Sequence, residues 1–268
     1  MKAFLLTEDQ ETTTAKSIAK KNAKIVGSSK FLSELHKASS ESVWVTDHSS
    51  IIELALREPD IFKLRDSLKK KTYMLIRGEA NRSWESALDS LFKKSFIFSD
   101  QASLSISEIL EVLSSKKPDH LAVGGSIDIE LGILVITRGD LSTLAVPINT
   151  FRTSGDGVSP DFSDFSIVDS GQTLKFGEYE ASVDSVLYEF DQEYRKSIKA
   201  QRSKTDKSFG ACLKRLRIQK GLLQSDFCTI DEKAIGRIER GEVNKPHKGT
   251  LNKIAKVLGV ASEEISSY

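Results

Sequence analysis

Five short apolar runs alternate with helix-like segments in residues 1–117, and this alternation limits the fold more than any other feature. The runs are KAFLLT, AKIVG, SVWVTD, TYMLIR and SFIFSD. Apolar strands separated by helices are typical of a parallel sheet that helices cover on both faces. Such strands are joined by right-handed crossovers. Residues 1–117 are therefore predicted to form an α/β domain around a parallel sheet.

A second segment, residues 118–192, is rich in β-branched runs but lacks that alternation. The stretch LGILVITRGDLSTLAVPINTF predicts a hairpin that turns at Arg138-Gly139-Asp140. The later stretch DFSIVDSGQTLKFGEYEASVDSVLYEF predicts two further short strands and a short helix. We therefore predict a small α+β module. The whole chain, at 268 residues, is long enough for two or three domains.

The last segment, residues 208–268, has helical periodicity and follows a basic linker at residues 193–207, which either continues a helix or is flexible. Apolar residues recur there at helical spacing: Leu213, Leu216, Leu251, Ile254, Ala255 and Leu258. Glycines stand where helices should end: Gly221, Gly241 and Gly259. This pattern predicts an all-α domain of short helices.

Charge is distributed unevenly along the chain. Residues 194–268 hold 17 Lys and Arg against 8 Asp and Glu, a net of +9, whereas residues 1–193 hold 22 against 30, a net of −8. The basic end should be attracted to a polyanion, and the acidic end should be repelled by it. The charge pattern therefore predicts a nucleic-acid partner for the C-terminal segment.

Cysteine usage and the apolar runs indicate the compartment. Cys212 and Cys228 are 16 positions apart, with no CxxC motif and no histidine at metal-ligand spacing. No apolar run approaches the ~18 residues of a membrane helix, and the N-terminal stretch lacks the features of a signal peptide. We expect a cytoplasmic protein that has no metal site, no cofactor and no membrane partner.

Three stretches of the last segment, LKRLRIQKGLLQSDF, AIGRIERGE and TLNKIAKVLGV, resemble the Cro/Xre-type helix-turn-helix family. The second helix is very short here, and Asp231 can cap the third, in which Ile235 and Ile238 point inward. Only three residues separate Phe227 from the third helix, whereas most members of the family have a longer second helix. The angle at the turn is therefore expected to differ.

The resemblance implies that the third helix lies in the major groove of double-stranded DNA, with its N-terminal residues facing base edges. By position, the base-facing residues are Glu232, Lys233 and Arg237. Lysine can donate to guanine, and glutamate can accept from cytosine. Phosphate contacts are expected from the start of the second helix and from the loop after the third, at Gln224, Ser225, Asn244, Lys245 and Lys248.

Other polar residues of this segment have structural interpretations. Glu239 is predicted to tie the turn to Arg215 or Arg217 in the first helix. Lys253 and Lys256 are predicted to form a solvated face. Cys228 is interpreted as a small apolar filler rather than as a redox sensor.

The order of elements in residues 1–117 resembles the receiver domains of response regulators, which have a flavodoxin-like sheet. The resemblance implies acidic residues after the first strand and a phosphorylatable aspartate after the third, at Glu8, Asp9 and Asp47. In place of the family's Ser/Thr and Lys, Arg77-Gly78 ends the fourth strand and Ser99-Asp100 ends the fifth. A degenerate receiver used for contacts is therefore expected. Because no nucleophile or glycine-rich phosphate loop adjoins Asp47-His48, no enzyme activity is predicted.

Residues 118–192 resemble a small uncharacterised bacterial domain that occurs beside helix-turn-helix modules, so a spacer or dimerisation role is expected. The whole chain is predicted to be a homodimeric, nucleoid-associated transcription regulator whose N-terminal regions serve dimerisation or regulation, with a regulatory protein as a further partner. Two alternatives stay open. One is an antitoxin-like protein that neutralises a partner and also binds its operator. The other is a phosphorelay receiver phosphorylated on Asp47.

Overall fold

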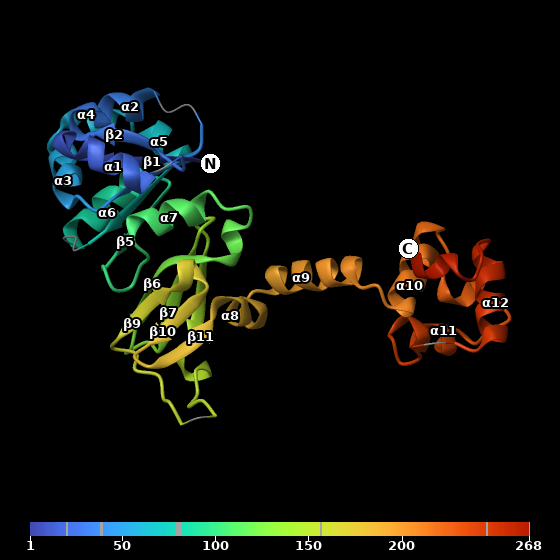
Figure 1. The fold of residues 1–268 in the computed structure, drawn as a ribbon. Coiled ribbons are helices and arrows are strands. Elements are labelled where there is room, and N and C mark those ends of the chain that lie inside the picture. Colours follow the sequence, from blue (N-terminus) through green and yellow to red (C-terminus); the bar gives the residue numbers. More distant parts are fainter. Residues whose placement is uncertain (20, 38–39, 79–81, 156, 245, 268) are drawn as a thin grey trace. The chain divides into compact units, whose positions relative to one another are not determined.

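A computed structural model describes residues 1–268 except 20, 38–39, 79–81, 156, 245 and 268 (Figure 1). The chain divides into two compact units, residues 1–191 and residues 192–268. Within the described ranges, no helix is both long enough and apolar enough to cross a bilayer.

The first unit contains a five-stranded parallel sheet with the strand order β2-β1-β3-β4-β5. Each apolar run that the sequence indicates forms one strand. The strands are β1 (Lys2–Thr7), β2 (Lys24–Gly27), β3 (Ser42–Thr46), β4 (Thr72–Arg77) and β5 (Lys94–Phe98). The prediction of a parallel α/β sheet is confirmed.

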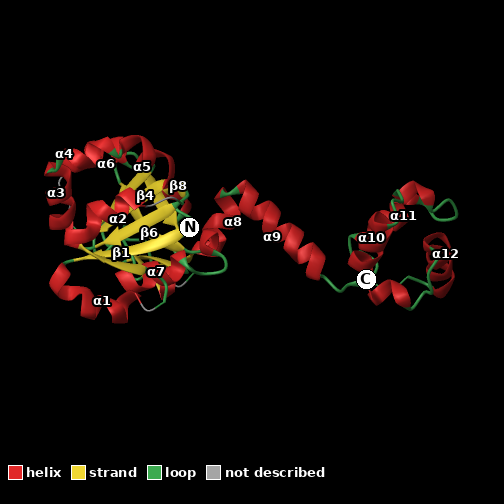
Figure 2. Ribbon diagram, turned by 90° about the horizontal axis from the view of Figure 1, so that it is seen from above, coloured by secondary structure: helices red, strands yellow, loops and turns green. Residues whose placement is uncertain are grey.

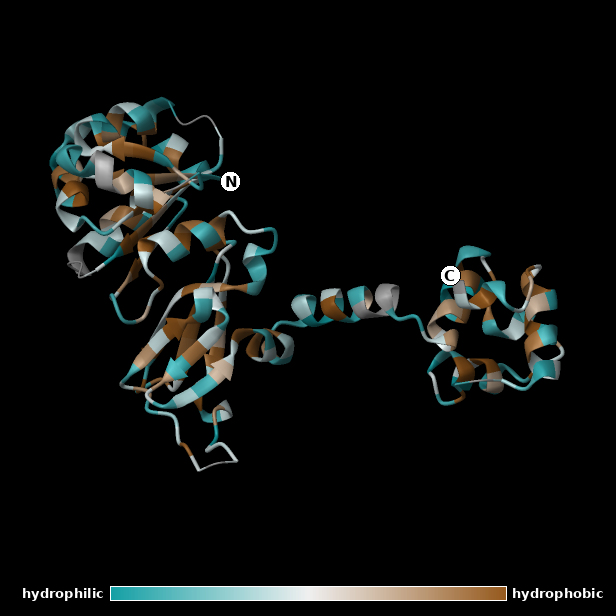
Figure 3. Cartoon of the chain, in the orientation of Figure 1, coloured by the Kyte–Doolittle hydropathy of each residue, from teal (hydrophilic) through white to brown (hydrophobic). Residues whose placement is uncertain are grey.

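Helices cover both faces of this sheet, as Figure 2 shows for α1 and α7 on one side and α3 to α6 on the other. The helices are α1 (Thr12–Ala19), α2 (Phe31–Lys37), α3 (Ser49–Arg57), α4 (Pro59–Lys63), α5 (Arg65–Lys71), α6 (Arg82–Leu91) and α7 (Ile106–Leu113). Side chains from β3 and β4, including Trp44, Met74 and Ile76, pack against the faces of α2 to α6 and are fully buried. Figure 3 shows hydrophobic residues, in brown, on the ribbon of this α/β part of the unit. Burial of this apolar surface stabilises the sheet.

Two small antiparallel sheets follow in the same unit. The first has β6 (Ala122–Asp128), β7 (Ile133–Arg138) and β8 (Thr143–Pro147), and the second has β9 (Phe165–Val168), β10 (Thr173–Phe176) and β11 (Tyr179–Ser182). Helix α8 (Val183–Phe190) completes the unit. The hairpin predicted at Arg138-Gly139-Asp140 is confirmed, because β7 pairs with β8 across that turn.

The second small sheet has three strands, whereas the sequence analysis predicts two. Gly177, with φ of +62°, makes the tight turn after β10 that allows residues 179–182 to pair back on it. The returning strand, β11, lies at the sheet edge, and its residues alternate between half-buried and exposed. It therefore has no apolar run by which the sequence would reveal it.

The loop after β5 joins the large sheet to β6. Gly125 N donates to Ala102 O at 2.9 Å, and Leu104 N donates to Val123 O at 3.1 Å. A Cβ at Gly124 would lie 2.6 Å from a ring carbon of Phe98, so glycine is needed at this close approach. Residues 1–191 consequently form one compact unit. The boundary between residues 117 and 118 stays a prediction.

The second unit is helical. Its elements are α9 (Gln192–Thr205), α10 (Phe209–Gln219), α11 (Glu232–Glu239) and α12 (Lys248–Leu258), with 3-10 turns at Gln224–Asp226 and Glu264–Ser267. The basic stretch that the sequence leaves as helix or flexible linker lies largely in α9. A core formed mainly by leucine and isoleucine holds the last helices together, including Leu213, Leu216, Ile235, Ile254 and Leu258. Gly221, Gly241 and Gly259 have positive φ where helices end, as predicted.

Candidate nucleic-acid interface

Helix α11 is held with one face in the core and the opposite face in solvent. The Asp231 side chain accepts a hydrogen bond from Lys233 N at 2.9 Å and so caps the helix. Ile235 and Ile238 are buried against α10 and α12, and both predictions for this helix are confirmed. Lys233 and Arg237 are exposed on the other side of the helix. The major groove of B-DNA is wide enough to admit an α-helix presented in this way.

The element before α11 is a single 3-10 turn over residues 224–226, which confirms the predicted very short second helix. Asp226 stabilises it by accepting a hydrogen bond from Leu223 N at 2.6 Å. The next residue, Phe227, is fully buried and anchors the turn in the core. Ser225 is exposed in this turn.

Glu239, at the end of α11, joins three elements of the unit. Its carboxylate accepts two hydrogen bonds from the Arg217 guanidinium, at 2.6 and 3.0 Å, and the Arg217 and Glu239 side chains are only 10% and 3% exposed. Arg217 also donates to Leu222 O at 2.8 Å. The hydrogen bonds that Arg217 donates to Glu239 raise the pKa of the Arg217 guanidinium, so it stays charged. The predicted structural role of Glu239 is confirmed, with Arg217 as the partner.

Gln224 has a second role that the sequence analysis misses. Its side-chain nitrogen donates to Glu239 Oε2 at 2.7 Å. Its side-chain oxygen lies 3.5 Å from the position that a Cβ on the buried Gly236 of α11 would occupy. Gln224 thus links the turn to α11, and its contact with a DNA phosphate stays a prediction.

A carboxylate between two arginines modifies the charge of the exposed face. Glu242 accepts from Arg240 Nε at 2.7 Å and from Arg237 Nε at 3.1 Å. The Arg240 hydrogen bond, with a smaller contribution from Arg237, lowers the pKa of the Glu242 carboxyl. Glu242 therefore stays ionised and holds both guanidinium groups beside the start of the following loop. This arrangement has only a weak signal in the sequence, because Glu242 lies two residues from Arg240 and five from Arg237, across the turn at Gly241.

The loop after α11 carries the other predicted phosphate contacts. Asn244 and Lys248 are exposed, and Lys248 begins α12. Lys245 lies outside the described residues. Lys253 and Lys256 are exposed on α12, which confirms the predicted solvated face. Glu232 is exposed at the first position of α11. The exposed basic residues of the unit are thus distributed over α11, this loop and α12.

The interpretation of Cys228 as an apolar filler is wrong. Cys228 is exposed, whereas Cys212 is buried in α10. Because the 3-10 turn ends at Asp226, Phe227 points into the core and the residue after it points to solvent. Phe227, and not Cys228, therefore packs into the core at this turn.

The acidic residues at the carboxyl edge of the large sheet lie at the ends of β1 and β3, which are neighbouring strands. Asp9 accepts a hydrogen bond from Ser29 Oγ at 3.0 Å, and Glu8 accepts one from Gln10 at 3.0 Å. Asp47 lies 3.5 Å from His48 Nε2, which also contacts Glu11 at 2.9 Å. No group of three or more described His, Cys, Asp or Glu side chains could hold a metal ion.

The ends of β4 and β5 carry a different charge pair. Arg77 Nη1 lies 2.8 Å from Asp100 Oδ1, and Arg77 Nε donates to Leu104 O at 3.0 Å. Asp100 thus occupies the end of the fifth strand, where a receiver domain would carry a lysine. Its carboxylate is paired with Arg77, so this position supplies no cation of its own for a phosphoryl group.

Comparison with known families identifies the C-terminal domain. The helix-turn-helix family model matches residues 213–265, which span α10 to the last 3-10 turn. The C-terminal domain is therefore a helix-turn-helix of the Cro/Xre type, as the sequence predicts, and this class supports binding of double-stranded DNA by the domain. The chain matches no curated protein and no solved structure.

Proposed function

We propose that this protein is a sequence-specific transcription regulator that reads the major groove with α11 and acts on the chromosome in the cytoplasm. The observation that carries the proposal is the orientation of α11. Ile235 and Ile238 hold one face in the core, and Lys233 and Arg237 project from the opposite face. A helix held in this way can enter the groove without exposing its apolar side.

Each exposed residue has a chemical role in this proposal. Lys233 donates to the guanine edge, Glu232 accepts from cytosine N4, and Arg237 reads a further base. Asn244 and Lys248 contact phosphates and set the register of the helix, as do Ser225 and Lys245. The net charge of +9 in residues 194–268 supports binding to the phosphate backbone.

The first unit is proposed to serve dimerisation and regulation. Its strand order, β2-β1-β3-β4-β5, is the order of flavodoxin-like and receiver domains and supports a receiver-like origin. The ion pair of Arg77 with Asp100 favours a degenerate receiver that works through contacts. The two small sheets of residues 122–182 provide edge strands for such contacts.

Substitutions of two lysines test the proposal. A duplex selected from a random pool by the full-length protein is compared with a scrambled duplex by fluorescence anisotropy. Lys233→Ala should weaken binding to the selected duplex by about 1–3 kcal/mol and leave the scrambled duplex little changed, because a base contact is lost. Lys248→Ala should weaken both duplexes alike and reduce the salt slope, because a phosphate contact is lost.

Lys256→Ala, on the solvated face of α12, serves as the matched control and should leave both affinities unchanged. Equal losses on both duplexes for Lys233→Ala would contradict its role as a base reader. Binding that stayed level from low to moderate salt would contradict the phosphate-contact model as a whole.

A further inference from the structure

The face of the large sheet that packs against α2 has a polar row at the amino ends of its strands. Strand register places Lys2 opposite Ser42 and Ser42 opposite Thr72, across β1, β3 and β4. Side chains at paired positions lie on the same face of a sheet. One ammonium group and two hydroxyl groups therefore stand side by side, in a unit whose other buried strand residues are mostly apolar.

The next row on the same face combines a cation with two rings. Register places Phe4 opposite Lys24 on β2 and opposite Trp44 on β3. The rings of Phe4 and Trp44 are stacked, with centroids 4.4 Å apart and planes at 6°. Lys24 Nζ lies 6.0 Å from the centroid of the Phe4 ring.

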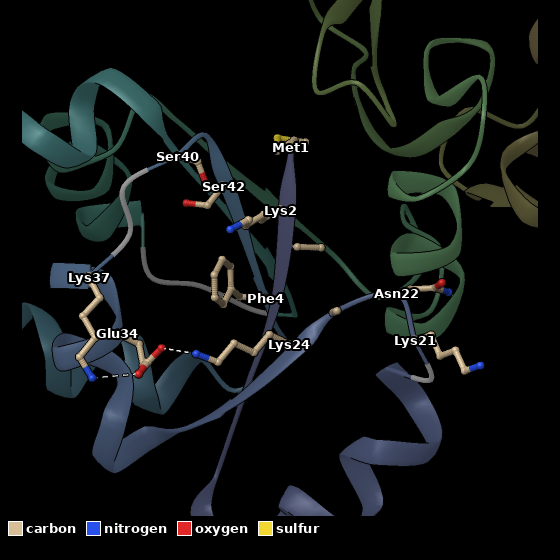
Figure 4. Close-up of a pocket in the computed structure, with 12 residues that line it drawn as sticks. Met1, Lys2, Phe4, Lys21, Asn22, Lys24, Glu34, Lys37, Ser40 and Ser42 are labelled. Carbon is tan, nitrogen blue, oxygen red and sulfur yellow. Dashed lines mark hydrogen bonds and ion pairs between the residues drawn. The ribbon is translucent and has the colours of Figure 1, made fainter.

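Four residues of these rows line a pocket of about 570 Å³, namely Lys2, Phe4, Lys24 and Ser42, and α2 forms a wall of it (Figure 4). This volume lies in the range of small-molecule sites. Figure 4 shows Lys24 extended toward Glu34 on α2, whereas Lys21 points away from the other side chains. The pocket lies at the amino ends of the strands and is therefore separate from the acidic residues at the carboxyl edge.

Three buried donors on this face have no hydrogen-bond partner among the described residues. They are Ser42 Oγ, Thr72 Oγ1 and Trp44 Nε1, three of the five such side-chain atoms in the described chain. Ser42 is 1% exposed and lines the pocket. Buried polar groups are normally paired, and all three of these atoms can donate. Of the three, Ser42 lines the pocket, so its hydroxyl can donate to a ligand that carries hydrogen-bond acceptors.

The charge at the pocket is positive within the acidic part of the chain. Glu34 is paired with Lys24 and, at 3.2 Å, with Lys37. Lys2 forms no ion pair with any described side chain and is exposed at the rim. The ammonium groups of Lys2, Lys24 and Lys37 thus line the pocket together with a single carboxylate, that of Glu34. The pocket is therefore cationic, although residues 1–193 carry a net charge of −8.

We propose that this pocket binds a small phosphorylated molecule. The phosphate lies between Lys2 and Lys24 and accepts a hydrogen bond from Ser42, and the apolar part of the molecule lies over Phe4. The proposal goes beyond DNA binding and does not depend on it, because ligand binding can be measured without DNA.

Calorimetric titration of the full-length protein with ATP, inorganic triphosphate and adenosine tests the proposal. ATP and triphosphate should both bind. The double variant Lys2→Gln/Lys24→Gln should bind them at least about tenfold more weakly, because the charge-assisted contacts are lost. The control Lys30→Gln/Lys116→Gln makes the same charge change at exposed lysines that do not line this pocket, and it should bind like the unaltered protein.

A second variant separates binding from folding. Ser42→Ala removes a buried hydroxyl without a partner, so the thermal midpoint should stay level or rise while phosphate affinity falls. Tighter binding of ATP than of triphosphate would support contact with Phe4. The proposal is overturned if neither phosphate compound binds, if adenosine binds as tightly as ATP, or if the lysine variant and its control bind alike.

Discussion

At the scale of single residues, the pair of Arg217 and Glu239 carries the largest consequence for the DNA-binding domain. Both side chains are nearly excluded from water, and their two hydrogen bonds compensate for the loss of hydration. Glu239 also fixes Gln224, so that one carboxylate positions both α10 and the turn against α11. Loss of this carboxylate would leave a buried guanidinium without a counter-charge.

Glu239→Ala is therefore expected to lower the free energy of unfolding of residues 192–268 by about 3–5 kcal/mol. Urea unfolding followed by far-ultraviolet circular dichroism measures the helical unit. Both tryptophans, Trp44 and Trp84, lie in the first unit, so their fluorescence reports on that unit separately and should not change. Glu263→Ala, at an exposed position, is the control and should lower the free energy of unfolding by less than about 0.5 kcal/mol. A loss at Glu239 no larger than this control would show that the pair is dispensable.

At the scale of secondary-structure elements, the orientation of α11 depends on how closely α10 approaches it. Gly210 is buried in α10, and a Cβ at this position would lie 2.1 Å from the carbonyl oxygen of Ile238. Because backbone atoms cannot move aside as a side chain does, any larger residue must displace α11. The buried glycine thus positions α11, the helix proposed to read the groove.

Gly210→Ala should lower the free energy of unfolding of the second unit by about 1–3 kcal/mol, because the added methyl group overpacks the contact. Affinity for the selected duplex should fall as well. Gly249→Ala, in α12, is the matched control, because no atom beyond its own stretch of helix backbone and its chain neighbours lies within 4 Å of the added methyl group. Alanine should stabilise that helix by up to about 1 kcal/mol. Equal stability of the two variants, measured by urea unfolding, would contradict the packing argument.

At the scale of the whole molecule, the two units differ in net charge and in the function proposed for each. The basic C-terminal segment carries the proposed surface for DNA, and a single groove-reading helix would contact only a few base pairs. One such module gathers too few contacts for useful specificity, whereas a twofold dimer reads two half-sites about one helical turn apart. The larger acidic unit has the surface for a self-interface, and its charge keeps it from the phosphates.

We therefore expect the full-length protein to be a dimer and the fragment of residues 192–268, which has its own core, to be mostly monomeric. The fragment should bind the selected duplex more weakly, because the second half-site contact is lost. Light scattering on both proteins measures the oligomeric state. A monomeric full-length protein, or a fragment that is equally dimeric, would place the assembly surface elsewhere.

The sequence by itself determined the elements whose signals are local. The apolar runs of β1 to β5, the cap at Asp231, the glycines after the helices and the short turn at residues 224–226 were all predictable, because each depends on residues close together in the chain. The family resemblance of residues 208–268 depends on the same local pattern. The edge strand β11 was missed because it has no apolar run.

Only the tertiary structure decided which distant side chains meet. Gln224 contacts Glu239 across 15 positions, and Glu239 selects Arg217 although Arg215 lies on the same helix. The row of Lys2, Ser42 and Thr72 exists because parallel strands from separate parts of the chain align in one register. Spacing along the chain determines the face on which a side chain lies within its own element, whereas its partners are determined by how the elements pack together.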